Sequence, residues 1–223
     1  MRREGRLTAG QQRALELLWP RFGVASGASM VDLAAIFGRV APVTLEIGFG
    51  NGETLAKQAE QQPERDFIGV EVHRPGVGHL LGEIDRRGLS NVRIFNHDAV
   101  EVLERCVPPA SLDTVQIFFP DPWHKKRHHK RRLIQQDFMR LLASRLSTGG
   151  VVHLATDWDD YAVHIQAVLD GMQDLFVPEG PQPVPERPGH RLATRFERRG
   201  ERLGHRVSDF LYRRRGGKPA VVR

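Results

Sequence analysis

The sequence predicts an α/β fold built on a largely parallel sheet, for three reasons. Short apolar, β-prone stretches alternate with helical stretches along most of the chain, which is the pattern of βαβ units. A glycine-rich turn, Gly48–Gly52, joins the first of these stretches to a helix. The 223 residues, 40% hydrophobic and 27% charged, fit one globular domain with a modest addition.

The first 40 residues are predicted to form a helical extension. Thr8 and Gln11 have the spacing of a capping box and precede a leucine-rich helix, and a second short helix is predicted at Met30–Phe37. We expect the first few residues to be mobile. The chain therefore divides into an extension, 1–40, and a main domain, 41–223.

Strands and helices then alternate. The predicted strands are Val43–Ile47, Phe67–Val72, Val92–Phe95, Thr114–Phe119 and Val151–Ala155, with a last strand at Val207–Arg213. The helices between them carry Leu55 and Ala59, run through Leu80 and Ile84, surround Val100–Leu103, and cover Arg132–Leu146 and Trp158–Met172. Four prolines make Gly180–His190 a loop or an extended connection.

Each of the first five strands leads to a candidate site residue. In order, these are Glu46 with the glycine turn, then Glu71, Asp98, Asp121 and Asp157. Ligands of open parallel sheets bind at the carboxyl ends of the strands, near the point where strand order reverses. We therefore expect these side chains to meet at one crevice.

The glycine spacing restricts the class of ligand that the turn is expected to bind. The third glycine of Gly48-x-Gly50-x-Gly52 follows the second by two positions, whereas a dinucleotide-binding turn has three. Glu71, about 20 residues later, is placed to bind a ribose, so an adenosine ligand without a pyrophosphate is favoured. Structural alternatives stay open: a plain tight turn, an ion pair for Glu46, a helix-terminal carboxylate for Glu71 and a helix cap for Asp98.

The segment Phe118–Arg132 is the most specific feature. Asp121 lies between two prolines, and Trp123 offers a face for base stacking, unless it is a core residue. From Asp121 to Arg132 there are six Lys or Arg and one Asp, a net charge of +5; from Arg191 to Arg223 there are 11 and three, a net of +8. These runs indicate a basic face for a polyanion; a solvated surface is the alternative.

These stretches closely resemble the bacterial tRNA (guanine-N7)-methyltransferase family. The resemblance runs through Leu45-Glu-Ile-Gly-Phe-Gly, Gly69-Val-Glu-Val-His, His97-Asp-Ala, Phe119-Pro-Asp-Pro-Trp, Arg127-His-His-Lys-Arg-Arg, Ala155-Thr-Asp-Trp and Thr194-Arg-Phe-Glu-Arg-Arg-Gly. It implies a Rossmann-like class I methyltransferase, with a mostly parallel seven-stranded sheet, one antiparallel strand and helices on both faces. Residues 41–223 would be the S-adenosylmethionine (SAM)-dependent domain. Gly180–Arg191 has no clear family pattern.

The resemblance also implies residue roles and the target, a guanine in the tRNA variable loop. SAM contacts fall on Glu46, Gly48, Gly50, Glu71, Asp98 and Asp121, and substrate contacts on Lys125, Asp157, Thr194, Arg195, Phe196 and Glu197. RNA contacts fall on Arg127, His128, His129, Lys130, Arg131 and Arg132. From its position between crevice and basic run, we take Asp121 as the catalytic residue.

The remaining expectations concern partners and location. The chain has no apolar stretch of about 18 residues, no secretory signal and one cysteine, Cys106. We expect a cytoplasmic protein, monomer or homodimer, that binds tRNA, with no membrane and no metal. Two rivals stay open: a nicotinamide-dependent oxidoreductase, and a non-catalytic RNA-binding protein with a relict SAM pocket.

Overall fold

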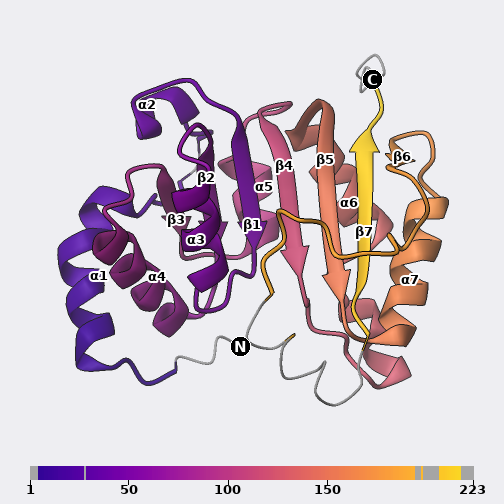
Figure 1. The fold of residues 1–223 in the computed structure, drawn as a ribbon, viewed down its shortest axis with the longest axis horizontal. Helices are drawn as coiled ribbons and strands as arrows, with labels where there is room; N and C mark the ends of the chain where they lie inside the picture. The colour runs from indigo at the N-terminus through magenta and orange to yellow at the C-terminus, as the bar shows by residue number, and fades with distance from the viewer. Residues whose placement is uncertain (1–4, 28, 194–196, 198–205, 217–223) are drawn as a thin grey trace.

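One mixed sheet organises the computed structural model of the chain, which describes residues 5–27, 29–193, 197 and 206–216 (Figure 1). Its strands are β1 (Val43–Ile47), β2 (Asp66–Val70), β3 (Val92–Phe95), β4 (Leu112–Phe118), β5 (Leu146–Thr156), β6 (Phe176–Pro178) and β7 (Ser208–Arg214). The α-helices are α1 (Ala9–Phe22), α2 (Leu33–Phe37), α3 (Glu53–Gln61), α4 (Arg74–Arg87), α5 (Ala99–Arg105), α6 (Gln136–Arg145) and α7 (Asp159–Asp170); η1 (Lys126–Arg131) is a 3-10 helix.

The strand order is β3-β2-β1-β4-β5-β7-β6. The first five strands of the chain are parallel, and β7 runs antiparallel to both of its neighbours, β5 and β6. This confirms the predicted seven-stranded sheet with one antiparallel strand. Strand order reverses between β1 and β4, so their carboxyl ends form the edge where such sheets bind ligands.

Helices cover both faces of the sheet (Figure 1). Alternate side chains of a strand point to opposite faces, and two buried clusters follow from this. On β2, Ile68 and Val70 join the cluster that includes residues of α5, α6 and α7. Phe67 joins the other cluster, with residues of α1, α3 and α4. Among the helices that the structure describes, none has the length and apolar character to span a bilayer.

The N-terminal extension packs on the β3 side of the sheet. The predicted capping box is present: the Thr8 amide donates to the Gln11 side chain at 2.9 Å, and the Gln11 amide donates to the Thr8 hydroxyl at 3.2 Å. Helix α1 lies against α4. The Val24 amide then donates to the carbonyl of Ile94 in β3 at 2.8 Å.

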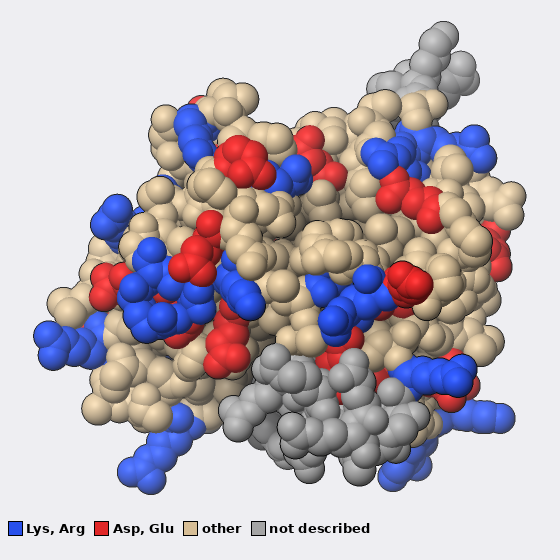
Figure 2. Space-filling view, in the orientation of Figure 1, with Lys and Arg blue, Asp and Glu red and all other residues tan. Residues whose placement is uncertain are grey.

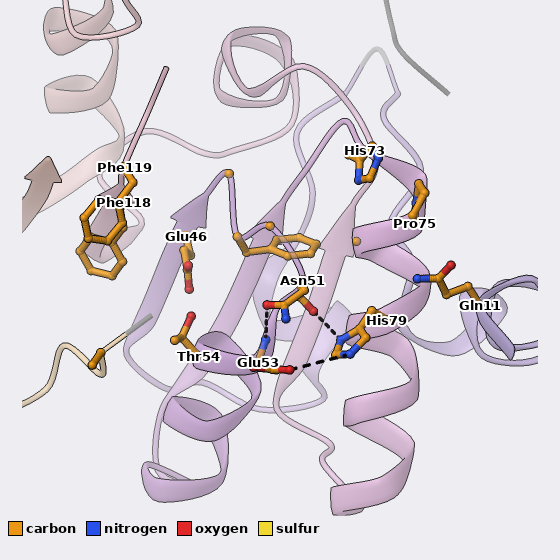
Figure 3. A pocket seen from close by; sticks show the side chains of 15 residues that line it. Gln11, Glu46, Asn51, Glu53, Thr54, His73, Pro75, His79, Phe118 and Phe119 are labelled. Carbon is orange, nitrogen blue, oxygen red and sulfur yellow. Dashed lines mark hydrogen bonds and ion pairs between the residues drawn. The ribbon is translucent and has the colours of Figure 1, made fainter. Parts of the chain in front are cut away.

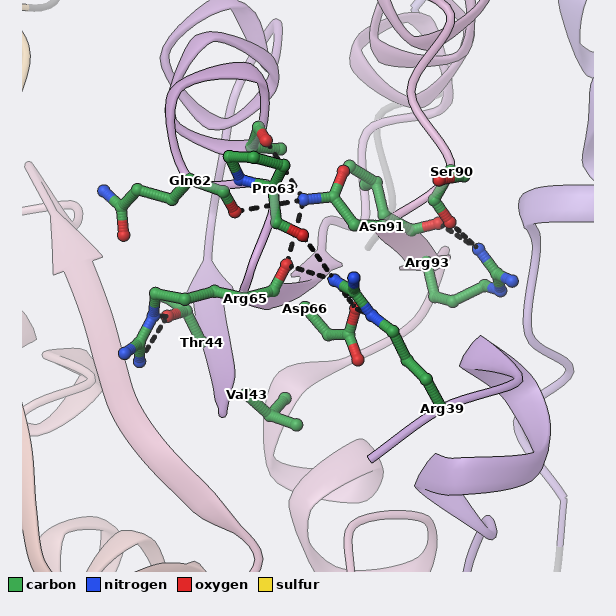
Figure 4. A network of polar contacts seen from close by, with 12 residues as sticks. Arg39, Val43, Thr44, Gln62, Pro63, Arg65, Asp66, Ser90, Asn91 and Arg93 are labelled. Atoms are coloured by element: carbon green, nitrogen blue, oxygen red, sulfur yellow. Dashed lines mark hydrogen bonds and ion pairs between the residues drawn. The ribbon is translucent and has the colours of Figure 1, made fainter. Parts of the chain in front are cut away.

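A polar network fixes the opposite edge of the sheet, where the parallel strands begin (Figure 4). The Arg39 guanidinium donates to the Asp66 carboxylate at 2.7 Å and 2.9 Å, and to the carbonyls of Pro63 and Arg65. The Asn91 side chain donates to three carbonyls, among them that of Arg65 at 2.9 Å. Pairing satisfies the buried Asp66 and Asn91 side chains, and the network joins the extension to the turns before β2 and β3.

The structure moves several predicted boundaries. The helix predicted from Met30 begins at Leu33, where Asp32 caps it by accepting the Ala35 amide. The helix predicted from Arg132 begins at Gln136, and the six residues before Arg132 form η1. Strand β5 extends from Leu146 to Thr156, well beyond the predicted Val151–Ala155. The short strand β6 was not predicted.

Candidate active site

A cavity of about 560 Å³ lies at the carboxyl end of β1 (Figure 3). Its wall is formed by the glycine turn, the starts of α3 and α4, and the end of β4. The lining residues are Gln11, Glu46, Gly48, Phe49, Gly50, Asn51, Glu53, Thr54, His73, Pro75, Gly76, His79, Phe118, Phe119 and Ala193. The cavity therefore occupies the switch point at which the sequence predicted a ligand.

The glycine turn has the backbone conformation that its composition predicts. Gly48, Gly50 and Gly52 all have left-handed φ angles, of 74°, 61° and 76°, which glycine adopts without a steric cost. Gly76, in the first turn of α4, is packed so closely that an added Cβ would collide with the Gly50 carbonyl oxygen. The turn and the start of α4 thus form a cradle of bare backbone beside the cavity.

Glu71 braces this cradle. One carboxylate oxygen accepts the Gly50 amide at 3.0 Å, and the other accepts the His73 amide at 2.9 Å, directly before α4. Glu71 follows β2 and is half-buried. Glu71 is therefore a carboxylate at a helix terminus, which was the structural alternative. It also contacts the glycine turn that was predicted to bind the ligand.

Glu46 is a buried acid that faces the cavity from β1, and Figure 3 draws it between the glycine turn and Thr54. Loss of hydration on burial, followed by the nearby charge of Glu71, raises the pKa of Glu46 to about 8. One of its oxygens, Oε2, has no hydrogen-bond partner among the described residues. Burial therefore favours the neutral acid at pH 7, and Oε2 is left for a hydrogen bond with a ligand.

Asp98 and Asp121 follow β3 and β4 at the same edge of the sheet. Asp98 caps α5, because its Oδ1 atom accepts the Val100 and Glu101 amides at 2.9 Å and 3.3 Å. Asp121 comes two residues after Phe119, which lines the cavity, but is not itself a lining residue. Its Oδ1 atom accepts the Trp123 amide at 3.0 Å, so Asp121 lies on an exposed turn next to the cavity.

The turn that carries Asp121 is held in an unusual conformation. Phe119 and Trp123, on either side of it, have φ angles of 53° and 48°, which cost energy for residues with a side chain. The surroundings hold the turn: the Phe119 amide donates to the Ala155 carbonyl at 2.8 Å, and the Arg131 guanidinium lies 5.1 Å from the Trp123 ring. Trp123 is half-buried, so it is not a core residue.

Arg132 differs from the rest of the basic run. Residues 125–127, 130 and 131 are exposed, whereas the Arg132 side chain is buried. Its guanidinium donates to the Pro122 carbonyl at 2.9 Å, forms an ion pair with Asp160 and lies over the Tyr161 ring. The predicted RNA contact of Arg132 is therefore corrected. A buried guanidinium with three partners is not available to a phosphate, and Arg132 instead holds the Asp121 turn against α7.

The predicted substrate residues are only partly described. Asp157 follows β5 at the carboxyl edge of the sheet and is half-buried, and Lys125 is exposed. Thr194, Arg195 and Phe196 lie outside the described residues. Glu197 is buried and forms an ion pair with Arg191, with oxygen–nitrogen distances of 2.6 Å and 2.8 Å.

The buried partners of Glu197 were not predicted from the sequence. Arg191 also donates to Asp209 of β7 at 2.9 Å, and Asp209 lies 2.7 Å from the ring of His153 on β5. The available signal was an acid, Asp209, inside the apolar pattern Val207–Tyr212. Without the antiparallel pairing of β5 and β7, nothing in the sequence indicated its partner.

Some described cations of the second basic run lie far from the site edge. Because β7 is antiparallel to β5, Ser208 pairs with Thr156 at the site edge and Arg213 pairs with Val151 toward the opposite edge. Arg213 and Arg215 donate there to the carbonyls of Gly149 and Gln173. Figure 2 shows Lys and Arg interspersed with Asp and Glu on the visible face. Among the described residues, no group of three or more His, Cys, Asp or Glu could hold a metal.

Comparison with known sequences gives strong matches over nearly the whole chain. A family model described as "Putative methyltransferase" matches residues 40–210. The tRNA (guanine-N(7)-)-methyltransferase of Methylococcus capsulatus is 58% identical over 214 residues, which are 95% of this chain and 91% of that protein. The protein of the same name from Alkalilimnicola ehrlichii is 58% identical over 217 residues, 96% of this chain and 91% of its own.

Solved structures share the fold at low sequence identity. An rRNA methylase from Streptococcus thermophilus aligns with a TM-score of 0.54 and 12% identity, over 79% of this chain and 88% of its own. A putative methyltransferase from Streptococcus mutans, solved with SAH, aligns with a TM-score of 0.52 and 9% identity, over 94% and 99%. These likenesses confirm the predicted Rossmann-like class I methyltransferase fold.

Proposed function

The chain belongs to the tRNA (guanine-N7)-methyltransferase family, and we propose that it methylates N7 of a guanine in the variable loop of tRNA, giving 7-methylguanosine. It is an S-adenosylmethionine-dependent tRNA methyltransferase. The proposal is carried by the position of the cavity next to the basic helix. Phe119 lines the cavity at the β1–β4 switch point, and the residues that follow it form the Asp121 turn and the basic helix η1.

The cavity suits SAM on three grounds. Its volume of about 560 Å³ is in the range of small-molecule sites. The bare backbone of Gly48 and Gly50 allows close approach by a nucleoside. Glu46 Oε2 has no hydrogen-bond partner among the described residues, so it is left to bind a polar group of the ligand. We propose that SAM is held by Glu46, Gly48, Gly50, Glu71, Asp98 and Asp121; when bound, it supplies an electrophilic methyl group on a positively charged sulfur.

The chain's own contribution to the reaction is positioning and charge. N7 of guanine has a free lone pair and no proton to lose, so no residue needs to act as a general base. Positive charge develops on the purine as it is methylated, and a nearby carboxylate stabilises that charge. We assign this role to Asp121, whose turn is fixed by the Trp123 amide and by Arg132 through Pro122.

The remaining roles belong to the same proposal. Lys125, Asp157 and Thr194–Glu197 would bind the substrate guanine, and Arg127, His128, His129, Lys130 and Arg131 would contact the tRNA. Residues 1–40 would serve as a helical extension of the catalytic domain, 41–223. The tRNA substrate and the single cysteine, which is buried, support a cytoplasmic location, and we propose a monomer or homodimer.

The decisive experiment is transfer of a labelled methyl group to unmodified tRNA, followed by nucleoside analysis. We expect the wild-type chain to give 7-methylguanosine in the variable loop. Asp121→Asn, which preserves shape, should lower the single-turnover rate by on the order of 100-fold and leave SAM affinity within about a few-fold. Asp137→Asn, on the exposed start of α6, is the matched control and should leave the rate unchanged.

Each alternative has its own outcome. Binding of SAM and tRNA without any transfer of label would favour a non-catalytic RNA-binding protein with a relict pocket. Label in another base, or at another position of guanine, would refute the assigned target. An unchanged single-turnover rate in Asp121→Asn would remove Asp121 from its catalytic role and leave the family assignment intact.

A further inference from the structure

The proline-rich segment between β6 and Arg191, which the sequence left without a role, follows the edge of β7. The Glu179 amide donates to the Leu211 carbonyl at 2.9 Å, and the Val184 amide donates to the Asp209 carbonyl at 2.8 Å. Between them, the Gln182 side chain accepts the Leu211 amide at 3.0 Å and donates to its carbonyl at 2.9 Å. The segment is thus attached to the sheet at three points, and Figure 1 shows it crossing in front of β7 and β5.

At its end, the segment inserts Arg191 into a buried polar cluster. The guanidinium pairs with Glu197 at 2.6 Å and 2.8 Å and donates to Asp209 at 2.9 Å. Asp209 Oδ1 lies 2.6 Å from Arg191 Nε and 2.7 Å from His153 Nε2. His153 Nδ1 lies 2.9 Å from His190 Nε2. Arg191, Glu197 and Asp209 are each at most 3% exposed.

Burial of these charges needs an explanation beyond stability. Removing charges from water is costly, and a buried ion pair often adds no more stability than apolar side chains of the same volume would. Loss of hydration lowers the pKa of His153 and lowers that of His190 to about 4, which disfavours the charged form of both imidazoles. Arg191 is the buried cation that pairs with both carboxylates, while the more exposed Arg187 contacts Glu197 at 3.5 Å. Such a cluster specifies one geometry, because each member loses its partner if the segment shifts.

The cluster is coupled to the wall of the cavity. The His190 carbonyl accepts the Gln58 side chain of α3 at 2.8 Å, and Ala193, two residues after Arg191, lines the cavity. The Arg191 guanidinium also lies 5.9 Å and 5.8 Å from the rings of Phe118 and Phe119, which line the cavity too. The segment therefore spans from β7 to α3 across the cavity edge, with Arg191 at its anchor.

We infer that Arg191 is a positioning residue, which acts through Asp209 and Glu197 to hold the cavity wall at Ala193 and the substrate residue Glu197 in register with the sheet. The inference rests on the proposed function, because Glu197 is assigned to the substrate there. Arg191 contributes a fork of donors that two carboxylates can share, which the single ammonium of lysine does not reproduce. It is buried, so it is not a phosphate contact.

The test compares Arg191→Lys with Arg187→Lys, which also keeps the charge. Arg187 contacts the same Glu197 carboxylate at 3.5 Å, but its side chain is 44% exposed. In Arg191→Lys we expect kcat for tRNA methylation to fall at least about tenfold, and amides of peptide 184–193 to exchange hydrogen at least about tenfold faster. The salt dependence of tRNA affinity should be unchanged, and Arg187→Lys should stay within about twofold of wild type in every measurement. If Arg191→Lys does not fold, the same measurements are made on Asp209→Asn, with the same expected results.

Three results would overturn the inference. The first is wild-type exchange and kcat in the folded Arg191→Lys protein. The second is a lower kcat with no change in exchange, because Arg191 would then act otherwise than by anchoring the segment. The third is a flatter salt dependence of tRNA binding, which would make Arg191 a phosphate contact. A wild-type chain that methylates no tRNA would refute the proposed function instead, and the exchange measurement would still decide whether Arg191 anchors the segment.

Discussion

Glu46 shows how burial sets the protonation of a single residue. Its folded-state pKa of about 8 exceeds the ordinary value of 4.5, so in the free protein the acid is neutral below pH 8. SAM carries positive charge, and its binding favours the carboxylate form, with release of a proton. We therefore expect SAM affinity, measured by titration calorimetry, to rise by up to about tenfold per pH unit between about pH 6 and 8, and to level off above.

The control for this pH dependence is Glu46→Gln, which has nearly the same shape and no titrating group. Its SAM affinity should be lower at pH 8 and almost independent of pH over the same range. Calorimetry in buffers with different ionisation enthalpies should detect the released proton in the wild-type protein only. A wild-type affinity that does not change between pH 6 and 8 would show that SAM binds without ionising Glu46.

At the residue scale, the positions of side chains could be predicted from the sequence better than their protonation and burial. Glu46, Glu71, Asp98 and Asp121 all reach the predicted edge of the sheet. An ion pair was one alternative for Glu46; burial instead raises its pKa and favours the neutral acid, and this burial depends on distant segments that form the cavity. Arg132 appeared equivalent to the other cations of its run, but Asp160 and the Pro122 carbonyl, brought close by the fold, bury it.

At the scale of elements, the start of α4 is the most demanding contact in the site. The Gly50 carbonyl leaves no room for a Cβ on Gly76. We expect Gly76→Ala to force the glycine turn away from α4, lower the free energy of unfolding by about 1–3 kcal/mol, and weaken SAM binding at least about tenfold. Thermal unfolding and titration calorimetry measure the two effects.

Gly82, two turns later in α4, is the matched control. It is exposed, and an added Cβ there would meet no atom within 4 Å. Alanine is favoured over glycine inside a helix by about 0.5–1 kcal/mol, so Gly82→Ala should raise the melting temperature and leave SAM affinity unchanged. Wild-type SAM affinity in Gly76→Ala would mean that the turn adapts, and that the cradle does not depend on this contact.

Element type could be predicted from the sequence more reliably than element boundaries. The apolar strands β1 and β3 have the predicted bounds, since buried parallel strands are short apolar runs. The helix predicted from Arg132 begins only at Gln136, and the unpredicted helix η1 lies before it, so that Arg132 donates to the Pro122 carbonyl. Strand β6 has only three residues, too few to form a recognisable strand pattern in the sequence. It is a strand because it pairs with β7.

For the molecule as a whole, topology decides which charges can act together. The sequence places two basic runs far apart in the chain, and each alone predicts a polyanion site. The parallel strands bring the first run to the cavity edge, whereas the antiparallel direction of β7 carries Arg213 and Arg215 to the opposite edge. A charge count cannot distinguish these cases, because strand direction in the last part of the sheet depends on long-range pairing.

This separation predicts two different salt dependences of tRNA binding. Each phosphate contact contributes about 0.7–0.9 to the slope of log affinity against log salt concentration. Replacement of Arg127, Lys130 and Arg131 by glutamine should therefore flatten the slope by about two units, because these side chains are exposed beside the Asp121 turn. Replacement of Arg213 and Arg215, which donate to carbonyls at the far edge, removes two charges and should leave the slope unchanged. The slopes are measured by filter binding. If the slope changes by the same amount per charge removed in both variants, tRNA is attracted by the net charge of the protein rather than bound at the cavity edge.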